Sequence, residues 1–219
     1  MDLAERSQRM EQAANRGLRR SIVVEELATR RWVHPLLELF YQGPGQGFSS
    51  QDQPLTGQDA AIFCLGVYTG AVPDPEFRKI TVDYTIEFAR ILRASSPAAA
   101  FSFLSGMGAD QTGRSRVPFA RYKGEAEKAL LAAGFHRLYI FRPAYIYPVE
   151  PRKEPNFSYR LLRAIYPVFR RLFPNQVIPA DDVARAMVDA AVSGKRGRES
   201  VVLENREIRA MAGSPHPSA

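Results

Sequence analysis

Ala60-Ala-Ile-Phe-Cys-Leu-Gly66 is the stretch that decides the fold class. A short apolar run that ends in Gly has the form of a β-strand that is buried on both faces and leads into a loop. Residues 100–105 and 138–141 repeat this form, and the spacing of apolar residues between the runs predicts helices over 75–95 and 118–133. Buried strands that alternate with such helices predict an α/β fold, in which a doubly wound parallel sheet carries helices on both faces.

The same pattern analysis extends to both ends of the chain. In the last third it predicts two helices, a short strand and a disordered tail, at 156–173, 181–193, 201–203 and 206–219. Towards the amino terminus, residues 2–18 are typical of a polar helix and Ser21-Ile-Val-Val24 of a strand. The regular alternation of strands and helices therefore begins near Leu55.

Composition excludes several classes of protein. The chain has 219 residues, of which 45% are hydrophobic and 24% charged, and this suits one ordinary globular domain. No apolar run reaches the roughly 18 to 20 residues of a membrane-spanning helix, and residues 1–20 do not have the apolar core of a secretory signal. We therefore expect a cytoplasmic protein. The lone Cys64 and the three widely separated histidines predict neither a disulfide nor a metal site.

The net charge of +7 would suit an anionic partner. The basic residues occur in scattered pairs, without a continuous stripe or a nucleic-acid-binding motif, so nucleic-acid binding is not expected. Segment 157–173 combines four arginines with large apolar residues. Two alternatives stay open for this segment: contact with a membrane surface, or an amphipathic lid helix with its arginines in solvent.

Five motifs occur in the order and spacing of a known family. They are Cys64-Leu65-Gly66, Val82-Asp83-Tyr84, Leu104-Ser105-Gly106-Met-Gly-Ala-Asp110, Ala120-Arg-Tyr-Lys123-Gly124-Glu125-Ala-Glu127 and Phe141-Arg-Pro-Ala-Tyr-Ile-Tyr-Pro148. Over about residues 55–205 the chain resembles the atypical short-chain dehydrogenase/reductases, most closely the NAD(P)-binding-domain group related to NAD-dependent epimerase/dehydratases and to the Tat-interacting-protein oxidoreductase. The resemblance implies a Rossmann-like NAD(P)-binding domain over 36–205, incomplete at its amino-terminal edge, after an unrecognised segment 1–35.

The resemblance also implies roles for three groups of residues. In the family, the loop at Cys64-Leu65-Gly66 passes beside the adenosine ribose of the cofactor, although a core strand with a Gly turn explains these residues equally well. Ser105 matches a serine that positions a substrate oxygen, and a hydroxyl that caps a turn is the alternative. Arg142-Pro143-Ala144 matches a corner that leaves room for the nicotinamide, and a rigid turn is the plainer explanation. The resemblance implies NAD or NADP as the cofactor. The residues that select between these two fall in the unrecognised region, so both alternatives stay open.

The catalytic pair of the family is a Tyr four residues before a Lys, a spacing that puts both side chains on one face of a helix. The Lys lowers the pKa of the phenol and bonds the nicotinamide ribose, while the phenol transfers a proton as hydride moves. Lys123 is present here, but Phe119 stands at the tyrosine position and has no proton to transfer. Tyr122 is expected to pack in the core, with replacement of the missing phenol as the alternative.

The phosphate-binding end of the family's domain has no counterpart in the sequence. Such a site needs a first strand and then a Gly-rich turn, whose backbone N–H groups meet the pyrophosphate. Residues 36–66 align with the third and fourth strands of the family, which confines the loss to the first strand, its turn and at most the second strand. The glycines of Gly43-Pro-Gly-Gln-Gly47 lie in a loop position rather than in a phosphate cradle.

We therefore expect an NAD(P)-binding oxidoreductase-like or epimerase-like protein that acts on a small molecule. Ser105 and Lys123 would orient the reactants, and the activity would be impaired by Phe119 and by the missing Gly-rich loop. The alternative is a non-catalytic Rossmann-like binding or regulatory protein.

Overall fold

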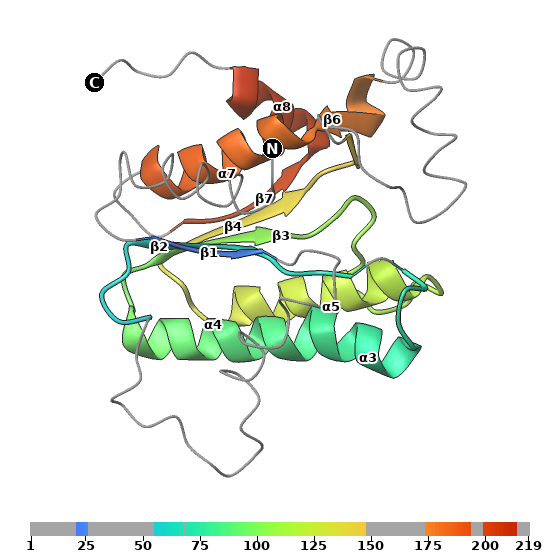
Figure 1. The fold of residues 1–219 in the computed structure, drawn as a ribbon, viewed down its shortest axis with the longest axis horizontal. Coiled ribbons are helices and arrows are strands. Elements are labelled where there is room, and N and C mark those ends of the chain that lie inside the picture. Colours follow the sequence, from blue (N-terminus) through green and yellow to red (C-terminus); the bar gives the residue numbers. More distant parts are fainter. Residues whose placement is uncertain (1–20, 26–54, 68, 148–173, 194–198, 214–219) are drawn as a thin grey trace.

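The molecule has a central sheet between two layers of helices. The computed structural model describes residues 21–25, 55–67, 69–147, 174–193 and 199–213. The helices are α3 (Asp74–Arg78), α4 (Tyr84–Ser95), α5 (Pro118–Ala132), α7 (Ala180–Ser193) and α8 (Asn205–Gly213). The first three cover one face of the sheet, and α7 and α8 cover the other (Figure 1). The predicted α/β architecture with helices on both faces is confirmed.

Five parallel strands form the sheet, in the order β1-β2-β3-β4-β7. Their bounds are Ser21–Glu25, Ala60–Cys64, Ala100–Leu104, Arg137–Arg142 and Glu199–Glu204. The strands β2, β3 and β4 are the apolar runs of the sequence, and their central residues are buried because helices cover both faces. All the described strands of this sheet run in one direction, so their carboxyl ends lie at one edge.

The strand predicted at Ser21-Ile-Val-Val24 is confirmed as β1. It pairs in parallel with β2, with Ser21 opposite Ala60 and Glu25 opposite Cys64. The described part of the chain therefore has one strand of this sheet before β2. The Gly-rich turn has no counterpart after it, because the first glycine beyond β1 is Gly43.

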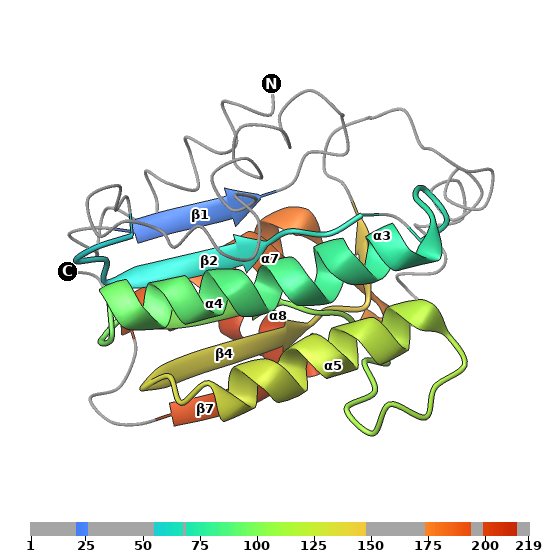
Figure 2. The ribbon, with the colours of Figure 1, turned by 90° about the horizontal axis from the view of Figure 1, so that it is seen from below.

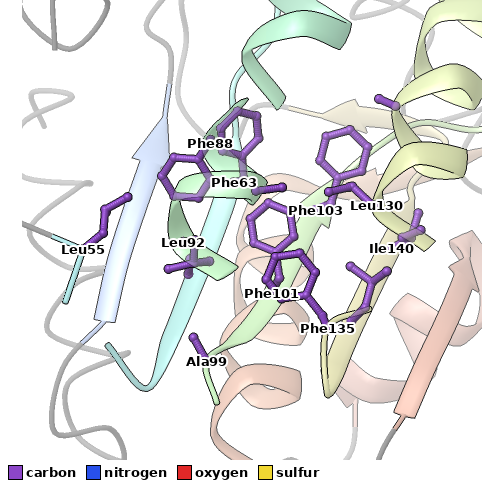
Figure 3. Packing of buried hydrophobic residues seen from close by; sticks show 14 residues of the cluster. Leu55, Phe63, Phe88, Leu92, Ala99, Phe101, Phe103, Leu130, Phe135 and Ile140 are labelled. Carbon is purple, nitrogen blue, oxygen red and sulfur yellow. The ribbon is translucent and has the colours of Figure 1, made fainter. Parts of the chain in front are cut away.

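Aromatic side chains fill the core between the sheet and the helices α4 and α5 (Figure 3). The ring centroids of Phe63 and Phe88 lie 5.0 Å apart, and those of Phe101 and Phe135 also lie 5.0 Å apart. On the opposite face, Ala186 and Met187 of α7 belong to a second core that includes Tyr139 and Phe141 of β4. Packing on both faces fixes β2 and β3, and with them the loops that leave their carboxyl ends.

The helix predicted over 75–95 is confirmed with one difference. A π-helical turn, η1 (Lys79–Asp83), joins α3 to α4 and buries Ile80, Thr81 and Val82. Figure 2 shows α3 and α4 in line with one another and alongside α5. A single π turn of this kind has no signature in the spacing of apolar residues, so the sequence did not predict it.

The carboxyl-terminal part confirms two predictions and overturns a third. The helix predicted over 181–193 is α7, and the strand predicted over 201–203 lies within β7. The prediction of a disordered tail over 206–219 is wrong for residues 206–213, because they belong to α8. Ile208 and Ala212 lie one helical turn apart and are both buried, which docks this helix on the domain.

A small second sheet was not predicted. It pairs β5 (Tyr145–Tyr147) in parallel with β6 (Val177–Pro179), which follows the short 3-10 helix η2 (Pro174–Gln176). Segment 157–173, for which a membrane contact or a lid was predicted, lies outside the described residues. Among the described helices, none has both the length and the apolar character that crossing a membrane requires.

Candidate functional site

The carboxyl ends of β2, β3 and β4 form one edge of the sheet, where ligands bind in open parallel sheets. Cys64 ends β2, Ser105 follows β3 and Arg142 ends β4, so the fold brings together three of the predicted site residues. The backbone N–H of Ser105 donates to the carbonyl oxygen of Phe141 at 2.8 Å, which ties the end of β3 to that of β4.

The segment Cys64-Leu65-Gly66 has one part in the core and one part at this edge. Leu65 packs partly against the aromatic core, and Cys64 packs partly against the core on the other face. A Cβ built at Gly66 would lie 3.9 Å from the amine nitrogen of Lys123. Both side chains contribute to packing, Cys64 also interacts electrostatically with Lys123, and the backbone of Gly66 faces the amine of that lysine.

Lys123 lies on α5 and reaches the space between the ends of β2 and β3. Its amine donates to the carbonyl oxygen of Leu104 at 2.8 Å and lies 4.8 Å from the ring centroid of Phe103. Only 7% of the residue is exposed. The sequence predicted this lysine as a site residue, and the structure places its amine beside Gly66.

The environment of Lys123 lowers the pKa of its amine to about 8. Burial is the main cause, because it penalises the charged form, and it outweighs the opposing attraction of Cys64 and Glu127. An amine with this pKa exists as both ammonium and free amine near neutral to mildly basic pH. The site thus holds a cation whose charge the protein compensates only in part.

Phe119 lies one helical turn before Lys123, where the sequence resemblance predicted the position of a catalytic tyrosine. Its ring lies against Gly106, where a Cβ would be 2.5 Å from Cζ of the ring. Cζ is the atom that would carry the hydroxyl of a tyrosine, so that hydroxyl would point towards Gly106 unless the ring turned. The phenyl ring offers no proton, and Gly106 is required for its close approach.

Tyr122 packs in the core, as predicted, and its side chain has a structural role. It is 5% exposed, and its ring meets that of Phe77 edge to face with centroids 5.7 Å apart. Its hydroxyl donates to a carboxylate oxygen of Asp74 at 2.6 Å. These contacts hold α5 against α3, and they do not favour Tyr122 as a replacement for the missing phenol.

Glu127 is a functional candidate that sequence reasoning missed. It is fully buried, and its two carboxylate oxygens accept four hydrogen bonds. Oε1 accepts from the Ser105 hydroxyl at 2.5 Å and from Nε of Arg142 at 2.9 Å. Oε2 accepts from the amide of Gln111 at 2.7 Å and from a terminal nitrogen of Arg142 at 2.5 Å. One carboxylate therefore joins the end of β3, the loop after it and the end of β4.

Arg142 extends this network to the neighbouring strand. Its other terminal nitrogen donates to Glu204, at the end of β7, at 2.9 Å. The hydrogen bonds that Arg142 donates to Glu127 raise the pKa of its guanidinium above the ordinary value, against the opposing effect of burial. Arg142, predicted as a cofactor contact, donates three hydrogen bonds to two carboxylates. These bonds join the ends of β4 and β7 to α5.

Helical spacing could have revealed Glu127. It lies four residues after Lys123, and four residues make about 400° of rotation, so the two side chains share one face of α5. Glu125, two residues away, lies on a different face, with 41% of its side chain exposed in a pair with Arg78. An acid on the same face as the predicted lysine was the available signal.

The turn Pro143-Ala144 is held by Asn205, a residue far along the chain at the start of α8. The backbone N–H of Ala144 donates to the side-chain oxygen of Asn205 at 2.9 Å, and the amide of Asn205 donates to the carbonyl oxygen of Asn175 at 2.8 Å. Asn205 begins α8 and is 4% exposed. Sequence reasoning gave it no role, because it stands next to the segment predicted as a disordered tail.

Comparison with known proteins supports the fold. No family model matches the chain. Among solved structures, RMD from Pseudomonas aeruginosa complexed with NADPH is 15% identical, with a TM-score of 0.53 over 84% of this chain and 77% of that one. The UDP-N-acetylglucosamine 4-epimerase from Bacillus cereus is 14% identical, with a TM-score of 0.52, and the match covers 87% of this chain and 83% of that one. The reductase domain of PhqB from Penicillium fellutanum is 19% identical, with a TM-score of 0.52, and the match covers 73% of this chain and 46% of that one.

The fold is Rossmann-like. At these identities the likeness is one of fold, and it agrees with the parallel strand order and with the helices on both faces.

Proposed function

We propose that this protein binds NAD or NADP at the carboxyl edge of its sheet, as an oxidoreductase-like or epimerase-like protein acting on a small molecule. The observation that carries the proposal is the place of the Lys123 amine, between the ends of β2 and β3 and beside Gly66. Two proteins of similar fold support the class of ligand and of reaction, since one is complexed with NADPH and the other is an epimerase.

The residues at the edge fit such a ligand in part. The backbone at Gly66 would meet the adenosine ribose, and the remaining N–H donors of Lys123 would meet the nicotinamide ribose. The turn at Pro143-Ala144 would leave room for the nicotinamide. When bound, the cofactor supplies a carbon that accepts or donates hydride. Because the sequence offers no Gly-rich turn for the pyrophosphate, we expect weaker affinity than such a turn would give.

The test is a titration with NAD+, NADH, NADP+ and NADPH, followed by calorimetry and by thermal shift. We expect binding of at least one cofactor, and we expect Lys123→Met to weaken it. Lys128→Met is the matched control, because Lys128 is an exposed lysine on the same helix. Absence of heat and of any thermal shift at millimolar cofactor would overturn the proposal.

A second candidate is a non-catalytic binding or regulatory protein. Phe119 favours it, because a phenyl ring stands where the family places its proton donor. Phe119→Tyr separates the two candidates in protein that binds cofactor. Turnover of an alcohol or ketone panel should rise in an enzyme, after the ring has turned away from Gly106, and should stay at zero in a binding protein.

A further inference from the structure

Strand β7 forms one edge of the main sheet (Figure 2). It pairs with β4 from Glu199 to Glu204, and within the described part of the chain no strand pairs with its other side. An open strand edge offers backbone N–H and C=O groups that can pair with a further strand. We infer that the open edge of β7 is a contact surface between two copies of this chain, which pair their β7 strands antiparallel about a two-fold axis. This inference does not depend on the proposed function.

The pairing with β4 determines which backbone groups of β7 point outwards. The N–H of Glu199 donates to the carbonyl oxygen of His136 at 2.7 Å, so Glu199 directs its backbone groups to β4. This direction alternates from residue to residue along a strand. The residues that direct their N–H groups away from β4 are therefore Ser200, Val202 and Glu204. Ser200 and Glu204 are exposed, which agrees with an uncovered edge.

The centre of β7 lacks the features that protect a strand edge from pairing. Its central residues, Ser200-Val-Val-Leu203, include no proline and no charge, and the register with β4 continues through them without a bulge. Val202 packs only partly against the aromatic core, and Val201 and Leu203 pack only partly against the core on the other face. A further strand would cover these side chains on both faces of the sheet, and burial of their apolar surface would stabilise the contact.

The side chains of β7 favour a second copy of the same strand, with the two-fold axis at Val202. Val202 then faces its own copy and Val201 faces the partner's Leu203, so apolar side chains pair on both faces of the sheet. Glu204 faces the partner's Ser200, and its outward N–H can donate to the carbonyl oxygen of that serine. An axis at Glu204 would instead place two carboxylates opposite each other, which destabilises a strand pair. The register centred on Val202 therefore combines apolar pairing with the absence of opposed charges.

The experiment measures the mass of the full chain by sedimentation equilibrium, from low micromolar to submillimolar concentration. We expect a reversible dimer with twice the chain mass of 24.5 kDa. Ser200→Glu puts a carboxylate opposite the partner's Glu204 and should weaken the dimer about tenfold, whereas Ser200→Lys puts an ammonium there and should strengthen it about threefold. Ala94→Glu is the matched control, because it adds the same charge at an exposed position of α4 and should leave the dissociation constant unchanged.

Amide hydrogen exchange followed by NMR tests the register of the two strands. Exchange at the N–H of Val202 should slow as the chain concentration rises, whereas the N–H of Val201, which is directed to β4, should be protected at every concentration. A monomer throughout the concentration range would overturn the inference. A dimer that Ser200→Glu and Ser200→Lys change in the same direction or not at all would also overturn it, as would a dimer in which exchange at Val202 does not depend on concentration.

Discussion

Glu127 and Lys123 are buried charged residues one turn apart on α5, and the protein compensates their charges to very different extents. Glu127 is fully buried and accepts four hydrogen bonds from Ser105, Gln111 and Arg142. Lys123 is 7% exposed, and its amine donates to one backbone carbonyl, that of Leu104. The protein therefore compensates the carboxylate almost completely, whereas burial of the amine lowers its pKa to about 8.

We interpret this difference as one between a charge that serves the fold and a charge that, under the proposed function, serves a ligand. When a buried carboxylate accepts hydrogen bonds from a guanidinium and from two neutral donors, its acceptor sites are occupied. Removal of the carboxylate leaves these donors buried without an acceptor. A buried amine with one acceptor keeps donors for an incoming group, at the expense of stability without that group. The first arrangement is a structural hub beside the site, and the second is typical of a binding residue.

The largest effect should follow from removing the hub. Glu127→Ala leaves the guanidinium of Arg142 largely buried and without its main partner, and we expect a loss of about 3 to 5 kcal/mol in the free energy of unfolding. Urea unfolding followed by circular dichroism measures it. The double variant Glu127→Leu with Arg142→Met should recover part of this loss, because it removes both charges.

Glu125→Ala is the control for Glu127→Ala. Glu125 lies on the same helix and pairs with Arg78 at 2.5 Å, but both side chains are more than 40% exposed. Water screens such a pair, so its removal should change stability by less than about 1 kcal/mol. Equal effects of the two substitutions would contradict the contrast between a buried hub and a surface pair.

The next effect is a pH dependence that belongs to Lys123. The lysine pKa is 10.5 in the unfolded chain and about 8 in the folded protein, so between these values the unfolded chain binds more protons. Stability should therefore rise with pH from about 8 towards 10.5, and the penalty is fully present below 8. Relative to Lys123→Met, the native protein should gain up to about 3 kcal/mol over this interval.

The measurement compares urea unfolding of the native protein and Lys123→Met from pH 7 to 10.5. Other groups titrate in this range, and the difference between the two proteins removes their contribution. Lys128→Met should run parallel to the native protein, since Lys128 is exposed. A difference that does not change with pH would show that the amine of Lys123 is as well solvated as a surface lysine.

A smaller effect should follow from the glycine between the two charges. A Cβ at Gly124 would lie 1.9 Å from the carbonyl oxygen of Asp110, so Gly124→Ala must push the loop from α5. The shift would carry Gln111 away from Glu127. After allowance for the better helix propensity of Ala, we expect a net loss of about 2 kcal/mol in the free energy of unfolding.

The readout that tests this account is local as well as global. Amide hydrogen exchange should rise in residues 108–117 and change little at Lys123, because its acceptor lies on β3. Gly113→Ala is a useful comparison, since a Cβ there would meet nothing within 4 Å and only its φ of +72° opposes the substitution. Uniform loosening of α5 would contradict a local displacement of the loop.

The sequence predicted the parts of the fold that rest on local pattern. Strands β2 to β4 and helix α5 follow from apolar runs and from helical spacing, which one segment carries by itself. The place of β1 depends on pairing with β2 across more than 30 residues, and no local pattern encodes that neighbour. Helix α8 was missed because the Gly, Ser and Pro of its end outweighed Ile208 and Ala212.

The site shows the same division. The motifs predicted Lys123 and Ser105 as site residues, whereas the role of Glu127 needs Arg142 from another strand and Gln111 from a loop. These partners meet only after the strands have aligned. The sequence also placed Phe119 at the tyrosine position, but its contact with Gly106 required the folded loop.

The smallest effect concerns Tyr122, a third polar side chain on α5. Tyr122→Phe removes the hydroxyl that donates to Asp74 at 2.6 Å and keeps the ring against Phe77, so we expect a loss of about 1 kcal/mol in the free energy of unfolding. Cofactor affinity should stay within twofold of the native value, because this hydroxyl bonds α3 and not the sheet edge. Were Tyr122 the replacement for the missing phenol, the same substitution would abolish turnover while leaving stability almost unchanged. The two readouts move in opposite ways under the two accounts, and so one variant places Tyr122 either with Glu127 as part of the fold or with Lys123 as part of the site.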